Sequence, residues 1–208
     1  MQYGEAPTGH FDTRAGDLCL CFANTVDWHA SDHPEEQLNS YADLLTWAQH
    51  MRLLTPERAE RLLSVSQQRP DDAATTLERA IELREGIYRL FAAIAHDEPV
   101  TKRDLSAVND SVPRPLAHLR VVEDNGVFDW GWSDGGQALD QMLWPVVHAA
   151  LTLLTSGSLD RIGQCEDDRG CGWLFYDASR NRSRRWCSME TCGNRAKVRR
   201  HLTSRRGE

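Results

Sequence analysis

The chain has 208 residues, of which 40% are hydrophobic and 26% are charged. This composition supports a packed core and excludes a chain that is disordered throughout, and no apolar run approaches the roughly 20 residues of a membrane-spanning helix. The first ten residues lack the basic start and apolar segment of a secretory signal, so we expect a cytoplasmic protein with no membrane partner and with reduced cysteines.

The net charge of −7 is divided unevenly along the chain. Residues 1–164 have a net charge of −12, whereas residues 165–208 have a net charge of +5. Residues 178–206 contain ten basic side chains and a single acidic one, Glu190. An acidic body with a basic C-terminal segment indicates that this segment binds an anion, and nucleic acid is the first candidate.

The first predicted helix begins after Asp17, a candidate N-cap. Leu18, Phe22 and Val26 follow at intervals of four residues, which predicts that the helix extends to Val26. The polar segment 29–34 should end it.

Helical patterns continue through the middle of the chain, over about residues 40–51, 56–69, 73–97 and 101–109. The clearest start lies at Thr55-Pro56, because a hydroxyl side chain caps a helix and proline suits its first position. Pro113 and Pro115 should then interrupt the helical structure.

A hairpin and a final long helix complete the large domain. Residues 119–123 and 127–132 flank an Asn-Gly pair, which is a strong hairpin signal between two alternating runs. An apolar helix is predicted over residues 137–155. Pro145 lies inside it and should either kink the helix or mark the point at which it starts again. We therefore expect three parts. Residues 1–15 form a loosely ordered lead-in, residues 16–160 form a mainly α-helical domain with one β-hairpin that folds without the rest, and residues 161–206 form a small zinc module.

Four of the six cysteines gather near the C-terminus: Cys165, Cys171, Cys187 and Cys192. Two close pairs separated by a short segment are typical of a tetrahedral zinc site with four thiolate ligands. We expect one Zn²⁺ per chain, whose binding supplies much of the folding free energy of a module too small for a core of its own. Two disulfides, which would require export, and four unrelated buried thiols are the alternatives.

The basic side chains lie between and after the two cysteine pairs. Residues 173–177 read as a strand, 178–185 as an exposed loop, and 193–202 as a helix on which Val198 and Leu202 should pack against the module. A knuckle, a strand and a helix that carries the last ligand suggest a treble-clef-like fold. The candidate DNA-binding residues, with phosphates read by the loop and bases by the helix, are Arg180, Arg182, Arg184, Arg185, Arg195, Lys197, Arg199 and Arg200. Neutralisation of the zinc–thiolate charge and a merely solvated face are the alternatives.

Three segments carry a resemblance to a known family: Cys171–Asp177, Ser179–Ser188 and Cys192–Lys197. They resemble the CGNR zinc-finger family of bacterial proteins. Residues 17–27 and 143–145 are similar to the domain that accompanies this finger, a stress-induced transcription regulator domain. The resemblance implies a DNA-binding transcription regulator of the stress response, with the four clustered cysteines as its zinc ligands.

The large domain is expected to sense a signal or to form a homodimer. Asn24, Asp27 and His29 are candidate ligand-binding residues for a small-molecule effector, because they lie together where the first helix ends. An apolar pocket is one interpretation of five tryptophans, namely Trp28, Trp47, Trp130, Trp132 and Trp144. Burial in the core, with Asn24 satisfying backbone groups, is the alternative interpretation.

No enzymatic signature is present in the sequence. It contains no phosphate-binding loop, no G-x-S-x-G, no H-E-x-x-H and no Rossmann fingerprint, and four thiolates leave zinc no open coordination position. Cys19 and Cys21 point to different faces of a helix, so we expect them to be small buried apolar residues. The competing function is a zinc-stabilised protein-interaction or RNA-binding module without enzymatic activity.

Overall fold

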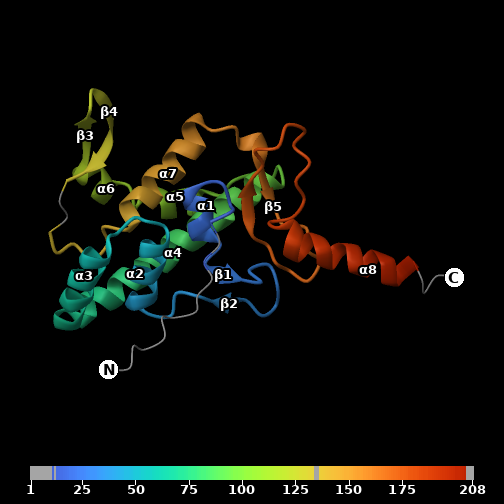
Figure 1. Cartoon of the computed structure of the whole chain (residues 1–208), viewed down its shortest axis with the longest axis horizontal. Coiled ribbons are helices and arrows are strands. Elements are labelled where there is room, and N and C mark those ends of the chain that lie inside the picture. The colour runs from blue at the N-terminus through green and yellow to red at the C-terminus, as the bar shows by residue number, and fades with distance from the viewer. Residues whose placement is uncertain (1–10, 12, 134–135, 205–208) are drawn as a thin grey trace.

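The computed structural model describes residues 11, 13–133 and 136–204. This part of the chain is mainly helical, as the sequence predicts (Figure 1). Its helices are α1 (Leu18–Ala23), α2 (Tyr41–His50), α3 (Pro56–Gln68), α4 (Pro70–Ala95), α5 (Lys102–Asn109), α6 (Pro113–His118), α7 (Leu143–Ser156) and α8 (Asn194–Ser204).

The strands of the described residues form three separate antiparallel pairs. They are β1 (Val26–Asp27) with β2 (Glu35–Glu36), β3 (Leu119–Asp124) with β4 (Val127–Trp132), and β5 (Ile162–Gln164) with β6 (Leu174–Tyr176). The predicted hairpin is therefore confirmed as β3–β4, and the predicted strand of the C-terminal module as β6. The pair β1–β2 was not expected from the sequence.

Hydroxyl caps fix the starts of three helices. The side chains of Ser40, Thr55 and Thr101 accept hydrogen bonds from the backbone N–H groups three residues later. Each bond satisfies one of the donors that a helix leaves unpaired in its first turn. The predicted helices at these three positions are confirmed.

The first helix is shorter than its periodicity predicts. Asp17 caps it as expected, by accepting a hydrogen bond from Cys19 N–H at 3.0 Å, but α1 ends at Ala23. Val26 lies in β1 instead of the helix. Thr25 donates its hydroxyl to the Phe22 carbonyl at 2.9 Å, so a local side-chain bond satisfies a carbonyl that a longer helix would have used.

The prolines lie near helix starts, which fits the restart expected at Pro145 as the alternative to a kink but makes the interruption expected at Pro113 and Pro115 wrong. Pro113 and Pro115 lie in α6 instead of interrupting the chain, and Pro145 lies in the first turn of α7. Proline is tolerated in a first helical turn because the N–H groups there have no partner within the helix. The last helix accordingly begins at Leu143, later than the predicted residue 137, with Pro145 near its start.

The hydrophobic core surrounds α1. This short helix packs against α4, α7 and β6, and all its residues after Leu18 are buried. The aromatic rings of Phe22 and Trp47 lie 4.9 Å apart at the centre. Within the expected lead-in, residues 1–10 and 12 lie outside the described residues, whereas Phe11 and Ala15 are buried in this core.

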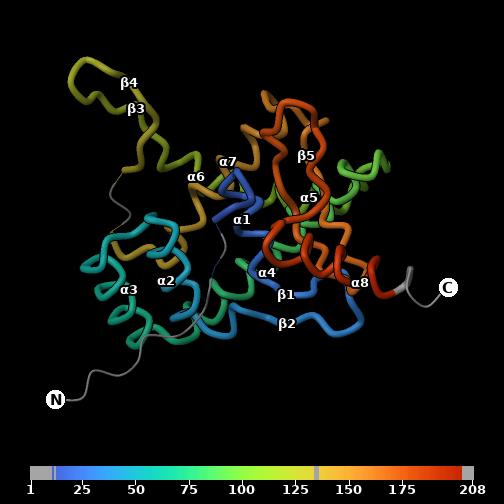
Figure 2. Tube along the Cα trace, turned by 45° about the vertical axis from the view of Figure 1, so that its right-hand side comes forward, coloured from blue at the N-terminus to red at the C-terminus, as the bar shows by residue number. Residues whose placement is uncertain are grey.

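The C-terminal hairpin β5–β6 joins the same core. Ile162 and Leu174 belong to the main hydrophobic cluster of the large domain, whereas Phe175 belongs to the cluster around the four cysteines. Successive residues of a strand point to opposite faces, so β6 divides its side chains between two cores. Figure 2 shows β5 against the helical body, with α8 beyond it.

Candidate metal centre and nucleic-acid interface

The four C-terminal cysteines converge on one point. Their Sγ atoms all lie within 4.8 Å of one another, and all four residues are buried. The Sγ atoms of Cys171 and Cys187 are 3.6 Å apart, and those of Cys187 and Cys192 are 3.5 Å apart. A tetrahedral zinc ion with Zn–S bonds of about 2.3 Å holds its sulfurs about 3.8 Å apart. The donor set and its spacing therefore fit one such ion.

The protonation of these thiols also fits a cation. All six cysteines are free, and hydrogen bonds from the other three thiols lower the pKa of Cys165 well below its ordinary value. The pKa of the Cys187 thiol is raised, first by its bond to Cys165. The pKa of Cys192 is also lowered and that of Cys171 is raised. Two of the four thiols therefore ionise more readily and two less readily, because negative charges in one buried cluster repel one another. A divalent cation removes this competition.

Two glycines shape the turn that presents Cys171. Gly170 and Gly172 have φ angles of 85° and 68°, which favour glycine over other residues. A Cβ atom on Gly172 would lie 2.6 Å from the Cβ atom of Ala30. The turn therefore packs directly on the loop that follows β1, where His29 N–H donates to the Cys171 carbonyl at 3.1 Å.

Two of the predicted DNA-binding arginines are bound within the module. Arg184 donates to the carbonyl oxygens of Trp186 and Cys187, at 3.1 and 2.6 Å, and its guanidinium lies 4.4 Å from the centre of the Phe175 ring. Arg195 donates to the Cys192 sulfur at 2.8 Å. Both side chains direct positive charge and donors at the cysteine cluster.

Buried Asp167 completes this arrangement. Its carboxylate accepts a hydrogen bond from Arg195 Nε at 3.0 Å and lies 3.6 Å from Arg199. Trp28 packs on the cysteine cluster, and the guanidinium groups of Arg169 and Arg195 lie 4.8 and 4.9 Å from its ring centre. The sequence identified the cysteines but did not place Asp167 or Trp28 beside them, and these two residues lie 139 positions apart.

The other predicted DNA-binding residues lie on the surface. Three arginines form ion pairs with nearby carboxylates, in the pairs Arg182–Asp160, Arg185–Glu166 and Arg199–Asp168. Arg180, Lys197 and Arg200 are exposed. Exposed ion pairs contribute only about 0–1 kcal/mol, so a phosphate can replace a carboxylate at little cost.

Helix α8 projects from the molecule and has two different sides (Figure 1). The expectation that Val198 and Leu202 pack on the module was wrong, because their exposed fractions are 60% and 55%. They line a surface groove of about 580 Å³ together with Arg195 and Arg199. Lys197 and Arg200 lie three residues apart and therefore share the other side of the helix.

The residues of the second predicted site make contacts within the fold. Asn24 is bound to the backbone of Leu174 through both ends of its amide, and Asp27 accepts a bond from Gln37 at 2.8 Å. His29 stacks on Tyr88, with ring centres 3.6 Å apart. All three side chains thus hold elements of the fold together.

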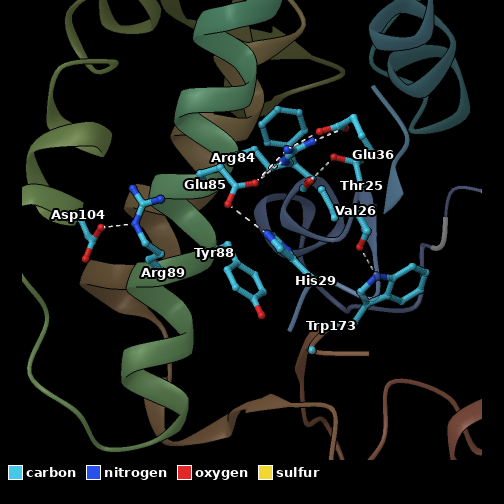
Figure 3. Close-up of polar contacts among 12 residues, drawn as sticks. Thr25, Val26, His29, Glu36, Arg84, Glu85, Tyr88, Arg89, Asp104 and Trp173 are labelled. Atoms are coloured by element: carbon cyan, nitrogen blue, oxygen red, sulfur yellow. Dashed lines mark hydrogen bonds and ion pairs between the residues drawn. The ribbon is translucent and has the colours of Figure 1, made fainter. Parts of the chain in front are cut away.

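His29 instead belongs to a buried charged network that the sequence did not reveal (Figure 3). Its Nε2 atom lies 3.1 Å from Glu85, and Arg84, only 2% exposed, binds Glu36 through two bonds of 2.6 and 2.7 Å. Burial opposes the ionisation of Glu85, but His29 and Arg84 outweigh it and lower its pKa to about 2. The one signal in the sequence was Arg84 at an inward position of an apolar helix face.

The five tryptophans considered as the lining of one pocket lie in different parts of the structure. Trp47 is fully buried and Trp28 lies beside the cysteines, whereas Trp130 and Trp132 belong to the hairpin. A cavity of about 580 Å³ does lie between α4, α5, α6 and α7, and Trp144 lines it with Arg79, Arg103 and other residues. Of the five tryptophans, only Trp144 lines this cavity.

Two family models match the chain. The model of the ABATE family, described as "Putative stress-induced transcription regulator", matches residues 16–157, and the model of the CGNR zinc finger matches residues 161–206. No curated protein matches the chain. Among the described residues, no helix combines the length and the apolar character that crossing a membrane requires.

Proposed function

Because the chain belongs to the ABATE family and carries a CGNR zinc finger, we propose that it is a zinc-dependent transcription regulator whose finger contacts duplex DNA. The observation that carries the proposal is a buried cluster of four thiols, within 4.8 Å of one another, at the base of a projecting basic helix. The cluster fits a metal, and the helix presents cations beside it.

The metal we propose is one Zn²⁺ held by Cys165, Cys171, Cys187 and Cys192. Zinc would join the turn after β5, the loop after β6 and the helical turn Met189–Gly193 that leads into α8, and would thereby stabilise a module of about 40 residues. Four thiolates leave the ion no open position for a substrate. This closed donor set, together with two families that are of regulator and finger types, supports a regulatory role without catalysis.

The DNA surface we propose is the side of α8 that carries Lys197 and Arg200, together with Arg180 of the preceding loop. All three are exposed, and the residues of the body up to 164 are acidic, with a net charge of −12. A polyanion is attracted to the exposed basic residues and repelled by the acidic body. Arg182, Arg185 and Arg199 can join them by exchanging a carboxylate for a phosphate.

The test is a titration of a labelled DNA duplex with the zinc-loaded full chain at several salt concentrations. The double variant Lys197→Gln/Arg200→Gln should bind more weakly and reduce the slope of log affinity against log salt by roughly two units. Arg61→Gln/Lys102→Gln, which removes two exposed cations from α3 and α5, is the matched control and should leave both unchanged. The proposal fails if wild-type binding is undetectable at low salt or does not depend on salt.

One observation favours the alternative, a protein-interaction module. Val198 and Leu202 are exposed along a groove on α8, and apolar side chains at i and i+4 are typical of helices that bind a partner. Replacement of both by serine should leave DNA binding unchanged if the two sides of α8 act separately. Preference for single-stranded RNA over duplex DNA would support the RNA-binding alternative.

For the large domain we propose the sensing of a small molecule or dimerisation. The cavity between α4 and α7 has a volume within the range of small-molecule sites. Asn24, Asp27 and His29 are engaged in bonds and ring contacts that hold the fold together, so we assign effector binding to the cavity instead of to them.

A further inference from the structure

The β3–β4 hairpin stands away from the helical body, as Figures 1 and 2 show. Five of its large apolar residues are exposed: Val121 by 63%, Val122 by 43%, Val127 by 67%, Phe128 by 74% and Trp130 by 58%. Single exposed apolar residues are normal on a protein surface, but adjacent ones mark an interaction surface. This concentration on one projecting element requires an explanation.

Three of these side chains share one face of the hairpin. The register pairs Val121 with Trp130, and Phe128 lies two residues before Trp130 on the same strand, so all three point the same way. At the base of this face, Trp132 packs against Trp144 of α7, with ring centres 6.0 Å apart. The face is therefore anchored at its base and uncovered toward its tip.

The outer edge of β3 is also open. Among the described strands, β3 pairs only with β4. Asn125 and Gly126 have φ angles of 51° and 84°, which identifies a two-residue type I′ turn closed by a hydrogen-bonded pair. Because such pairs alternate with unbonded ones, the backbone N–H and C=O groups of Val121 and Glu123 point away from β4. An open edge of this kind is a template for another strand.

We propose that this edge of β3 pairs with the same edge of a second copy of the chain. The two hairpins then form one four-stranded antiparallel sheet, in which the outward backbone groups of Val121 and Glu123 bind each other across a two-fold axis. Pairing centred on Val122 places Arg120 opposite Asp124 of the second copy, and symmetry repeats this contact. Arg120 and Asp124 have no ion-pair partner among the described residues of their own copy; they bind only a carbonyl and an amide beside them.

Charge disfavours other occupants. The hairpin carries three carboxylates, Glu123, Asp124 and Asp129, against the single cation Arg120, so it repels DNA. In the proposed sheet both copies contribute Val121, Phe128 and Trp130 to one continuous face, on which the register also places Glu123. A two-stranded hairpin is marginal by itself, whereas four strands with an apolar face are stable.

The test is the mass of the zinc-loaded full chain by sedimentation velocity over a range of concentrations. We expect a reversible dimer of twice 23.6 kDa. Val121→Pro removes an outward N–H that β4 does not use and should give a monomer, whereas Val121→Thr keeps that donor and should remain dimeric. Circular dichroism checks that each variant is folded.

A charge exchange tests the register. Arg120→Asp alone and Asp124→Arg alone place like charges opposite each other and should each be monomeric. An equal mixture of the two variants places opposite charges at both contacts and should restore the dimer. A monomeric wild-type chain, or a dimer that persists in folded Val121→Pro and in both charge variants, would overturn the proposal.

Discussion

Asn24 and Leu174 lie 150 residues apart and are joined by two hydrogen bonds. Asn24 Nδ2 donates to the Leu174 carbonyl at 2.9 Å, and Leu174 N–H donates to Asn24 Oδ1 at 2.8 Å. The amide side chain of Asn24, at the end of α1, therefore makes the pair of hydrogen bonds that a neighbouring strand would make with β6. The contact links the first helix of the large domain directly to the strand that precedes the second cysteine pair.

We expect Asn24→Ala to lower the free energy of unfolding by on the order of 3 kcal/mol, because it leaves a buried N–H and C=O of Leu174 without partners. Urea unfolding followed by circular dichroism measures this change. Asn109→Ala, at an exposed position, is the control and should change stability little. Equal effects of the two variants would show that the Asn24 contact contributes nothing.

A chain cut after residue 157 should fold, as its helical pattern predicts, but with a lower melting temperature than the full chain. The cut removes Ile162 and Leu174 from the shared core and exposes the apolar surface that they cover. Calorimetry of the two proteins measures the difference. Equal melting temperatures would mean that the large domain gains nothing from the finger.

Cys187→Ser should abolish the binding of one zinc ion per chain, because three thiolates and a hydroxyl hold zinc less tightly. Metal analysis after dialysis measures the ion, and tryptophan fluorescence reports the change, since Trp28, Trp173 and Trp186 pack on the cysteine cluster. Cys21→Ala changes a buried thiol outside the cluster and should keep its zinc. Retention of zinc by Cys187→Ser would exclude that residue as a ligand.

Arg182→Gln and Arg184→Gln should affect different properties of the protein, namely DNA binding and zinc retention. Arg182 pairs with a surface carboxylate, so its loss should weaken DNA binding with little effect on stability. Arg184 binds carbonyl oxygens on both sides of Cys187 and lies on Phe175, so its loss should speed the release of zinc to a chelator. Metal-release rates and DNA titrations together separate the two roles, and an interchange of the results would refute this assignment.

Glu85 should contribute to the acid sensitivity of the fold. Its pKa is lowered from 4.5 to about 2, so its stabilising effect is complete above about pH 4.5 and is lost as the pH falls toward 2. Glu85→Gln should therefore lower stability at neutral pH, by on the order of 2 kcal/mol after screening by solvent, and bring it close to wild type near pH 2. Urea unfolding of both proteins across this range measures the difference, and a gap that does not change with pH would contradict it.

The sequence by itself determined the features that depend on neighbouring residues. Ser40, Thr55 and Thr101 reach backbone donors three residues away, and Asn125-Gly126 needs only its own φ angles to close a hairpin. The cysteine spacing likewise predicts two turns that each present a pair of thiols. These interactions are local, so the pattern of residue types is enough to predict them.

The tertiary structure alone decided which partner each side chain meets across the chain. It joined Asn24 to Leu174, and it left Val198 exposed, because the small core around the cysteines is filled by Phe175 and nearby tryptophans. It also placed Arg184 and Arg195 against the cysteine cluster and left Lys197 at an exposed position. Such contacts join residues more than a hundred positions apart, and spacing along a sequence carries no information about them until packing brings the segments together.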